Sequence, residues 1–244
     1  MRRIALLLLL LALAAPARAA EPLVADLTSH LVAITTGFTG TNVVLFGATD
    51  GPGDVVVVVR GPDRDAVVRR KRRVAGIWVN TSKVTFTGVP SYYAVYSNRP
   101  IEEIAPPAML GLHQIGVANL RFGVVGKPSP EKIADFRAAL IRGRQREGLF
   151  VDAAGGFSFL SNRLFHVAIS FPANVPTGTY LVQIFLVRDK AVVSGQTTPL
   201  IVSQVGIDAE VNEFADRRAL LYGVIAVAGA AMAGWLASLP FRNA

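Results

Sequence analysis

The side chains best suited to chemistry form one run of five consecutive cations, Arg69-Arg70-Lys71-Arg72-Arg73. Guanidinium and ammonium groups attract anions, so a cluster of them favours lipid head groups or the acidic face of a partner protein. The alternative is an exposed edge strand or hairpin whose charges keep it soluble and prevent pairing with other chains. The run therefore predicts an anion or partner contact at Arg69, Arg70, Lys71, Arg72 and Arg73.

The other reactive side chains form no catalytic or metal-binding pattern. His30, His113 and His166 are far apart, and none has a histidine or carboxylate at ligand spacing. The chain lacks the glycine-rich motifs of nucleotide-binding proteins, the Gly-x-Ser-x-Gly motif of hydrolases, and any cysteine. We therefore expect no catalytic residue, no metal and no cofactor. An enzyme of unrecognised class is the alternative.

Residues 220–239 are the element that would position any membrane-bound function, because these twenty residues carry no charge. A helix of this length is about 30 Å long, which matches the hydrocarbon core of a bilayer. Ala226, Ala230 and Gly234 recur every four residues and share one face, where small side chains let another helix approach closely. The segment predicts one transmembrane helix with a helix–helix contact at this stripe. An alanine-rich helix that faces only lipid is the alternative.

The N-terminus has the three parts of a secretory signal peptide. Arg2 and Arg3 form its basic start, residues 4–15 its apolar core and residues 17–19 its cleavage site. An uncleaved signal anchor is the alternative, and both interpretations place the following residues outside the cytoplasm. We therefore expect a bacterial inner-membrane protein with a periplasmic body. Cleavage would remove three arginines and lower the formal net charge from +8 to +5. In that compartment this basic balance favours anionic lipids or envelope polymers, and no nucleic acid is expected as a partner.

The region between the two membrane signals predicts a mainly β body. Short apolar runs alternate with turn residues at intervals of about 8–12 residues, which favours an antiparallel sandwich or barrel. A Pro-x-Gly turn before Tyr180 favours an immunoglobulin-like β-sandwich, in which this tyrosine bonds to the backbone. The apolar run in Asp54–Arg60 predicts a central strand covered on both sides, and Trp78 is expected in the core. One inserted helix is predicted at 129–147, with Ser129 as its N-cap.

The predicted organisation divides the chain into consecutive segments. They are a signal peptide (1–19), an N-terminal β-sandwich lobe (20–98), a connector (99–148) with the helix 129–147, a second β lobe (149–207), a juxtamembrane stalk (208–219), a transmembrane helix (220–239) and a cytoplasmic tail (240–244). One sandwich or two is an open alternative for the body.

Short motifs along the chain resemble those of one family. They are Phe38-Thr39-Gly40, Phe46-Gly47-Ala48, Arg60-Gly61-Pro62, Gly76-Ile77-Trp78-Val79-Asn80, Phe171-Pro172, Pro176-x-Gly178-x-Tyr180, Leu221-Tyr222-Gly223, Gly234-Trp235 and Phe241-Arg242. On these motifs the chain resembles the alphaproteobacterial putative transmembrane protein family over essentially its whole mature length. The resemblance implies a secreted N-terminus, a periplasmic body and one C-terminal span. It also suggests, as a partner, a permease resembling sulfite or sulfonate exporters.

Together these observations predict a single-pass, non-enzymatic membrane protein whose body is an accessory or interaction module. Its expected partners are the lipid bilayer and a polytopic inner-membrane protein, such as an anion-exporter-like permease. Tethering would make a weak contact effectively intramolecular. The alternative function is binding of anionic envelope components through the basic patches.

Overall fold

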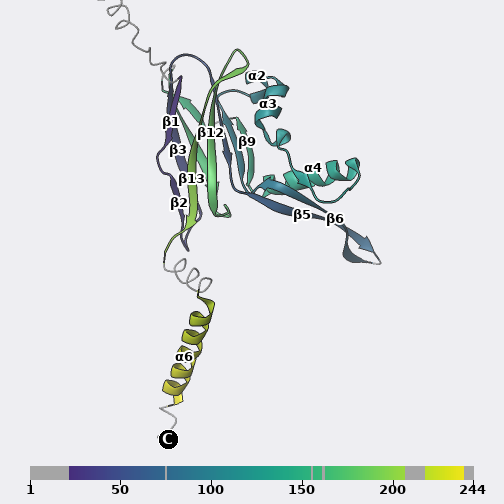
Figure 1. Ribbon diagram of the computed structural model, residues 1–244, viewed down its shortest axis with the longest axis vertical. Helices are drawn as coiled ribbons and strands as arrows, with labels where there is room; N and C mark the ends of the chain where they lie inside the picture. Colours follow the sequence, from purple (N-terminus) through teal and green to yellow (C-terminus); the bar gives the residue numbers. More distant parts are fainter. Residues whose placement is uncertain (1–21, 75, 155, 161–162, 207–217, 239–244) are drawn as a thin grey trace, which may run out of the picture.

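The computed structural model describes residues 22–74, 76–154, 156–160, 163–206 and 218–238, and this part of the chain is mainly β (Figure 1). The predicted signal peptide, the stalk up to residue 217 and the tail lie outside the described residues. The strands are β1 Leu23–Leu27, β2 Leu31–Ile34, β3 Gly40–Thr49, β4 Asp54–Arg60, β5 Asp63–Val74, β6 Ile77–Pro90, β7 Tyr93–Ser97, β8 Gly123–Val124, β9 Phe150–Ala154, β10 Phe157–Phe159, β11 Leu164–Pro172, β12 Gly178–Arg188 and β13 Ala191–Gln204. The helices are α2 Ile101–Ile104, α3 Pro107–His113, the 3₁₀ turn η1 Val117–Asn119, α4 Pro130–Arg146 and α6 Ala219–Ser238.

Two sheets form the body and share one hydrophobic core. Sheet A has the strand order β1-β3-β11-β10, and sheet B has the order β2-β13-β12-β4-β7-β9. Alternate residues of sheet A face the core, whereas β4 is buried from Val55 to Val59. Because β4 lies between β12 and β7 and is covered on both faces, a run of β-branched valines suits it. The prediction of a central strand at 54–60 is confirmed.

Strands from both ends of the chain lie side by side in these sheets. β11 pairs with β3 from Leu164↔Ala48 to Pro172↔Gly40. β12 pairs with β4 along the whole length of β4. Residues 20–98 and 149–207, expected as two lobes, therefore contribute neighbouring strands to the same two sheets. Periodicity along one segment shows which face is buried, but it does not show which distant strand completes the sheet.

Sheet B contains two parallel pairs, β2–β13 and β7–β9, where antiparallel pairing alone was expected. A parallel pair needs a long crossover connection, usually with a helix. The chain between β7 and β9 is such a crossover and carries α2, α3, η1 and α4. An immunoglobulin-like strand order is not confirmed, and the fold is a mainly β body built from several sheets.

Tyr180 makes the hydrogen bond to the backbone that the sequence predicts for it. The Tyr180 hydroxyl donates a hydrogen bond to the Pro176 carbonyl oxygen, 2.5 Å away. Its ring lies 5.8 Å from the rings of both Tyr92 and Phe171, so one side chain joins β12 to β11 and to the loop before β7. The predicted hydrogen bond to the backbone is therefore confirmed, although the strand order around it differs from the expected one.

The crossover covers the second face of sheet B. The Tyr93 hydroxyl, in β7, donates to the Gln114 carbonyl oxygen at 2.7 Å, directly after α3. The His113 ring lies 5.2 Å from the ring of Phe185 in β12. These contacts place α3 over β7 and β12, which explains why both faces of the sheet are buried there.

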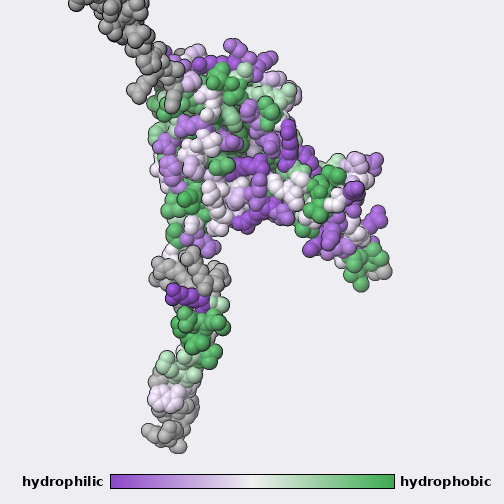
Figure 2. All heavy atoms as spheres, viewed as in Figure 1, coloured by the Kyte–Doolittle hydropathy of each residue, from purple (hydrophilic) through white to green (hydrophobic). Residues whose placement is uncertain are grey.

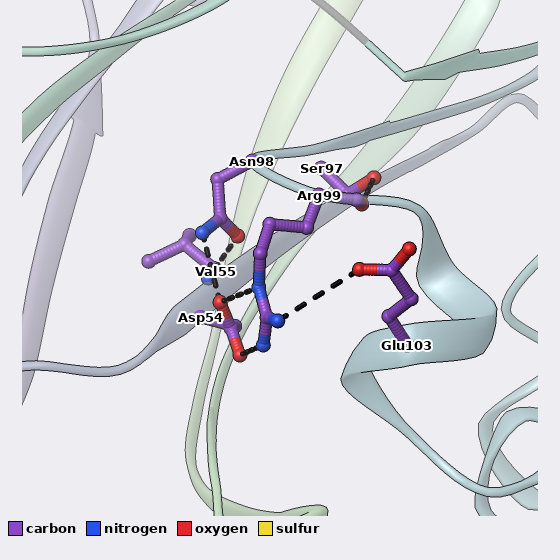
Figure 3. Close-up of polar contacts among 6 residues, drawn as sticks. All are labelled: Asp54, Val55, Ser97, Asn98, Arg99 and Glu103. Atoms are coloured by element: carbon purple, nitrogen blue, oxygen red, sulfur yellow. Dashed lines mark hydrogen bonds and ion pairs between the residues drawn. The ribbon is translucent and has the colours of Figure 1, made fainter.

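A polar network fastens the start of this crossover to β4 (Figure 3). The Asp54 carboxylate accepts hydrogen bonds from Asn98 Nδ2 and from Arg99 Nε, each at 2.9 Å. The Arg99 guanidinium also faces Glu103 of α2, 3.9 Å away. The hydrogen bonds from Arg99 hold the pKa of the Asp54 carboxyl below its usual value, so this group stays ionised to a lower pH than a free aspartate.

The helix predicted at 129–147 is present as α4. The Ser129 side chain accepts a hydrogen bond from the Lys132 N–H at 3.4 Å, and Pro130 occupies the first turn, where its missing N–H costs nothing. One face of the helix is buried, at Phe136 and Leu140. The N-cap prediction is therefore confirmed.

Candidate interaction surfaces

A two-stranded arm carries the basic run. β5 and β6 pair from Asp63↔Pro90 to Val74↔Ile77, and the two-residue strand β8 joins them only at the base, opposite Phe86 and Thr87. Figure 1 shows this arm extending away from the body. Gly76 has a φ of +85°, which suits glycine at the turn between the two strands. We call this β5–β6 hairpin the arm.

The end of the arm is apolar and exposed. Val74, Ile77, Trp78 and Val79 are 53%, 70%, 66% and 44% exposed, and we call these four residues the apolar tip. Figure 2 shows the hydrophobic end beyond hydrophilic residues of the same arm. The prediction that Trp78 is a core residue is wrong. The register puts it opposite Arg73, and the described residues around it in both strands, 71–74 and 77–81, are all exposed.

The five predicted contact residues lie together in β5, beside and behind the apolar tip. Arg69, Arg70, Lys71, Arg72 and Arg73 are all exposed in β5, and we call them the basic stem. In the described part of the chain only Arg70 among them has an ion-pair partner. The Arg73 Nε donates to the Gly76 carbonyl oxygen at 3.2 Å and so braces the turn. Concentrated, largely unneutralised positive charge beside apolar side chains suits a partner that is both anionic and apolar.

Arg70 has a different role from its neighbours. Its guanidinium donates to Asp135 Oδ2 at 3.0 Å and lies 5.0 Å from the centre of the Phe136 ring, and both partners belong to α4. Such a contact combines an ion pair with a cation–π interaction. Arg70 therefore docks the base of the arm on α4, a role that the run of charges in the sequence does not reveal.

A second surface is a cleft of about 710 Å³ along α4. Apolar residues such as Val117, Ile133 and Ile141 line it, together with Arg142 and Asp152. The Asp152 carboxylate accepts the Val117 N–H at 3.1 Å and thereby holds η1 against β9. Sequence reasoning missed this cleft because its lining comes from three elements spread over residues 117–152.

One of the two arginines in the wall of this cleft, Arg137, is already bonded. Arg137 donates from its guanidinium to the carbonyl oxygens of Ala118 and Leu120, 2.7 and 2.9 Å away, and it lies over the Phe122 ring. These contacts hold η1 and the residues that follow it against α4. Nothing in the described lining identifies a ligand, so we assign the cleft none.

The three histidines lie in separate parts of the fold. His30 is near β2 and contacts Asp26 at 3.1 Å, His113 packs on Phe185, and His166 lies in β11 opposite Phe46. Within the described residues no three histidine, aspartate or glutamate side chains gather as metal ligands would.

The apolar segment near the C-terminus is helical, as α6. Every described side chain of α6 is exposed, and Ala226, Ala230 and Gly234 lie on one face of it. Over the stretches that the structure describes, no helix meets the combined length and hydropathy of a bilayer-crossing helix. The structure thus shows a helix at this place but not the predicted transmembrane span.

The fold and its surfaces define a class: a β-rich body with a projecting basic arm, followed by an apolar helix. A family model described as "Putative transmembrane protein (Alph_Pro_TM)" matches residues 22–243, and the chain belongs to this family. The predicted resemblance is confirmed, and the family description supports a membrane protein. Neither a curated protein nor a solved structure matches the chain.

Proposed function

We propose that this protein is a membrane-tethered, non-enzymatic interaction module held beside a polytopic inner-membrane protein. The observation that carries the proposal is α6. Its apolar side chains are exposed along its described length, with Leu220 at 88% and Val227 at 71%. Exposing such side chains to water costs about 25 cal/mol for each Å². Lipid or another apolar helix would remove this cost.

Three further observations support a tether. Residues 220–239 carry no charge, the family is described as transmembrane, and the N-terminus has the composition of a signal peptide. In this arrangement α6 is the single membrane helix, the body lies in the periplasm, and the tail is cytoplasmic. A long translocated domain outweighs the opposing effect of Arg217 and Arg218 on orientation.

The face of α6 that carries small residues is the proposed contact with the partner. Ala226, Ala230 and Gly234 stand one turn apart, and a Cβ added at Gly234 would meet nothing within 4 Å. Small residues allow two helix backbones to approach closely in a bilayer. Tethering then raises the local concentration of the body at its partner, such as an anion-exporter-like permease.

Purification of the tagged, full-length protein from crosslinked native membranes tests this function. We expect a polytopic membrane protein to co-purify, and we expect its loss when Ala226, Ala230 and Gly234 are all replaced by Leu. The control variant carries Ala228→Leu, which enlarges the opposite side of the same helix. Equal recovery of the partner with both variants would rule out the helix contact, and recovery of the protein from the soluble fraction would rule out the tether.

A second candidate function is binding of anionic envelope components. The observation that favours it is the exposure of Lys71, Arg72 and Arg73 on the arm, away from the acidic residues that the structure describes as ion-pair partners. Charge reversal at these three positions separates the two candidates, because only the second requires their positive charge.

A further inference from the structure

The apolar tip and the basic stem overlap at the end of one ribbon. The register pairs Val74 with Ile77, Arg73 with Trp78 and Arg72 with Val79, so Val74 and Ile77 cap the hairpin and the next two levels each pair an apolar side chain of β6 with an arginine of β5. Side chains on both faces are exposed there. A monomeric soluble protein gains nothing by exposing these residues together, so the tip is suited to a binding partner.

We propose that the arm is a second membrane attachment, and that its apolar tip enters the interface of an anionic lipid bilayer. Tryptophan prefers the boundary between head groups and acyl chains, where its ring is apolar and its N–H reaches polar groups. The long side chains of Arg72 and Arg73, opposite Val79 and Trp78, can reach back to the lipid phosphates, and Lys71 follows them along β5. This inference rests on the proposed tether and narrows the anionic ligand of the arm to lipid.

The size of the tip favours lipid over a protein partner. From their exposed fractions, the four side chains present on the order of 400 Å², about half of what one partner buries in a standard protein interface. A bilayer needs no such area of complementary shape, because insertion depends on apolar area and charge alone. The charge of the basic stem also complements anionic head groups.

The position of the arm agrees with this role. In Figure 1 the tip and the end of β13, where the chain continues towards α6, lie at the same end of the body along its long axis. The turn between β12 and β13 lies at the opposite end, since β13 runs 14 residues, or about 45 Å, between the two. A bilayer that holds α6 would therefore face the tip rather than the β12–β13 turn.

The two tryptophans of the chain make separate tests of the arm and of the tether, because Trp78 lies in the tip and Trp235 in α6. Trp235→Phe leaves Trp78 as the only indole, and Trp78→Phe leaves Trp235. Each full-length variant is reconstituted in phosphatidylcholine nanodiscs with or without phosphatidylglycerol, and its fluorescence is measured with brominated acyl chains. Bromine quenches an indole only on close contact, so the loss of emission reports insertion.

We expect brominated lipid to quench Trp78 in discs that contain phosphatidylglycerol and to quench it less in phosphatidylcholine alone. Arg72→Glu with Arg73→Glu should reduce the ratio of lipid-inserted to free arm by roughly tenfold or more. The matched control is Lys127→Glu with Lys190→Glu, which changes the net charge equally at exposed sites outside the arm and should leave the quenching unchanged. Circular dichroism confirms that each variant is folded.

The outcomes separate this inference from the proposed function. Quenching of Trp235 without quenching of Trp78 would support α6 as the membrane tether and overturn the inference that the arm inserts. The reverse pattern would support insertion of the arm and overturn the tether. A blue shift of Trp78 emission without bromine quenching would mean burial against protein, including a second copy of the chain, and would also overturn the inference. Equal quenching in the arm and control charge variants would overturn the role assigned to the basic stem.

Discussion

At the scale of single residues, close packing in the body depends on positions where no side chain fits. An added Cβ at Gly47, in β3, would lie 2.5 Å from the Phe165 ring and 2.8 Å from both the Ala25 Cβ and the Val24 carbonyl oxygen. The contacts come from β11 on one side and β1 on the other, so β3 cannot move away from one without approaching the other. Glycine here maintains the spacing of sheet A.

Gly47→Ala should therefore destabilise the protein by about 1–3 kcal/mol, the usual cost of overpacking a core. Chemical denaturation of the full-length protein, followed by circular dichroism, measures the change in unfolding free energy. Gly37→Ala is the matched control, because its Cβ would meet nothing within 4 Å. Equal stability of the two variants would show that sheet A adjusts at Gly47 at no cost.

At the scale of elements, the arm is a ribbon whose base is docked and whose end is not. The side chains at its base are buried, namely Ala66, Val84 and Phe86. Arg70 contacts Asp135 and Phe136 of α4. Beyond Arg70 the described residues of the two strands, 71–74 and 77–81, pair with each other and are all exposed. A two-stranded hairpin is marginally stable by itself, so the orientation of the apolar tip depends on the contact with α4.

Arg70→Ala should accordingly increase hydrogen exchange in β5 and β6 beyond the bulge at Arg70/Lys71. The pair is solvent-exposed, so we expect a loss of about 1 kcal/mol, which is roughly a fivefold increase in local opening. Hydrogen exchange with mass spectrometry on the intact protein measures it. Arg72→Ala removes the same charge without a contact to α4, and an equal effect from that variant would refute the docking role.

At the scale of the whole molecule, the body is held together by pairings between distant parts of the chain. β3 needs β11, and β4 needs β12, across more than a hundred residues of sequence. The crossover from β7 to β9 then places helices on the remaining face of sheet B. Neither half of the chain can complete sheet A or sheet B alone.

A fragment of residues 20–148 should therefore fail to fold, because β3 and β4 would each expose an unpaired edge and a half-covered apolar face. Amide NMR spectra of this fragment and of the intact body provide the measurement. Poor dispersion is expected for the fragment only. A well-dispersed spectrum from residues 20–148 would instead support an independent N-terminal lobe.

Local chemistry predicted the features whose cause is local. The cap of α4 depends on Ser129 and Pro130, the burial of β4 on an unbroken run of valines, and the bond of Tyr180 on a carbonyl four residues earlier. The basic run was visible for the same reason. Each of these features is specified by residues close together in the chain, so short-range pattern carries the information.

Only the tertiary structure decided the pairing of the halves, the parallel strands of sheet B and the exposure of Trp78. An aromatic residue in a strand has the same local pattern whether or not a second sheet lies above it, and the arm extends beyond every such sheet. The difference between Arg70 and its neighbours likewise required Asp135 of α4, 65 residues further on, to be placed beside β5. Long-range register is determined by the summed packing of the whole core, which no single segment of the sequence contains.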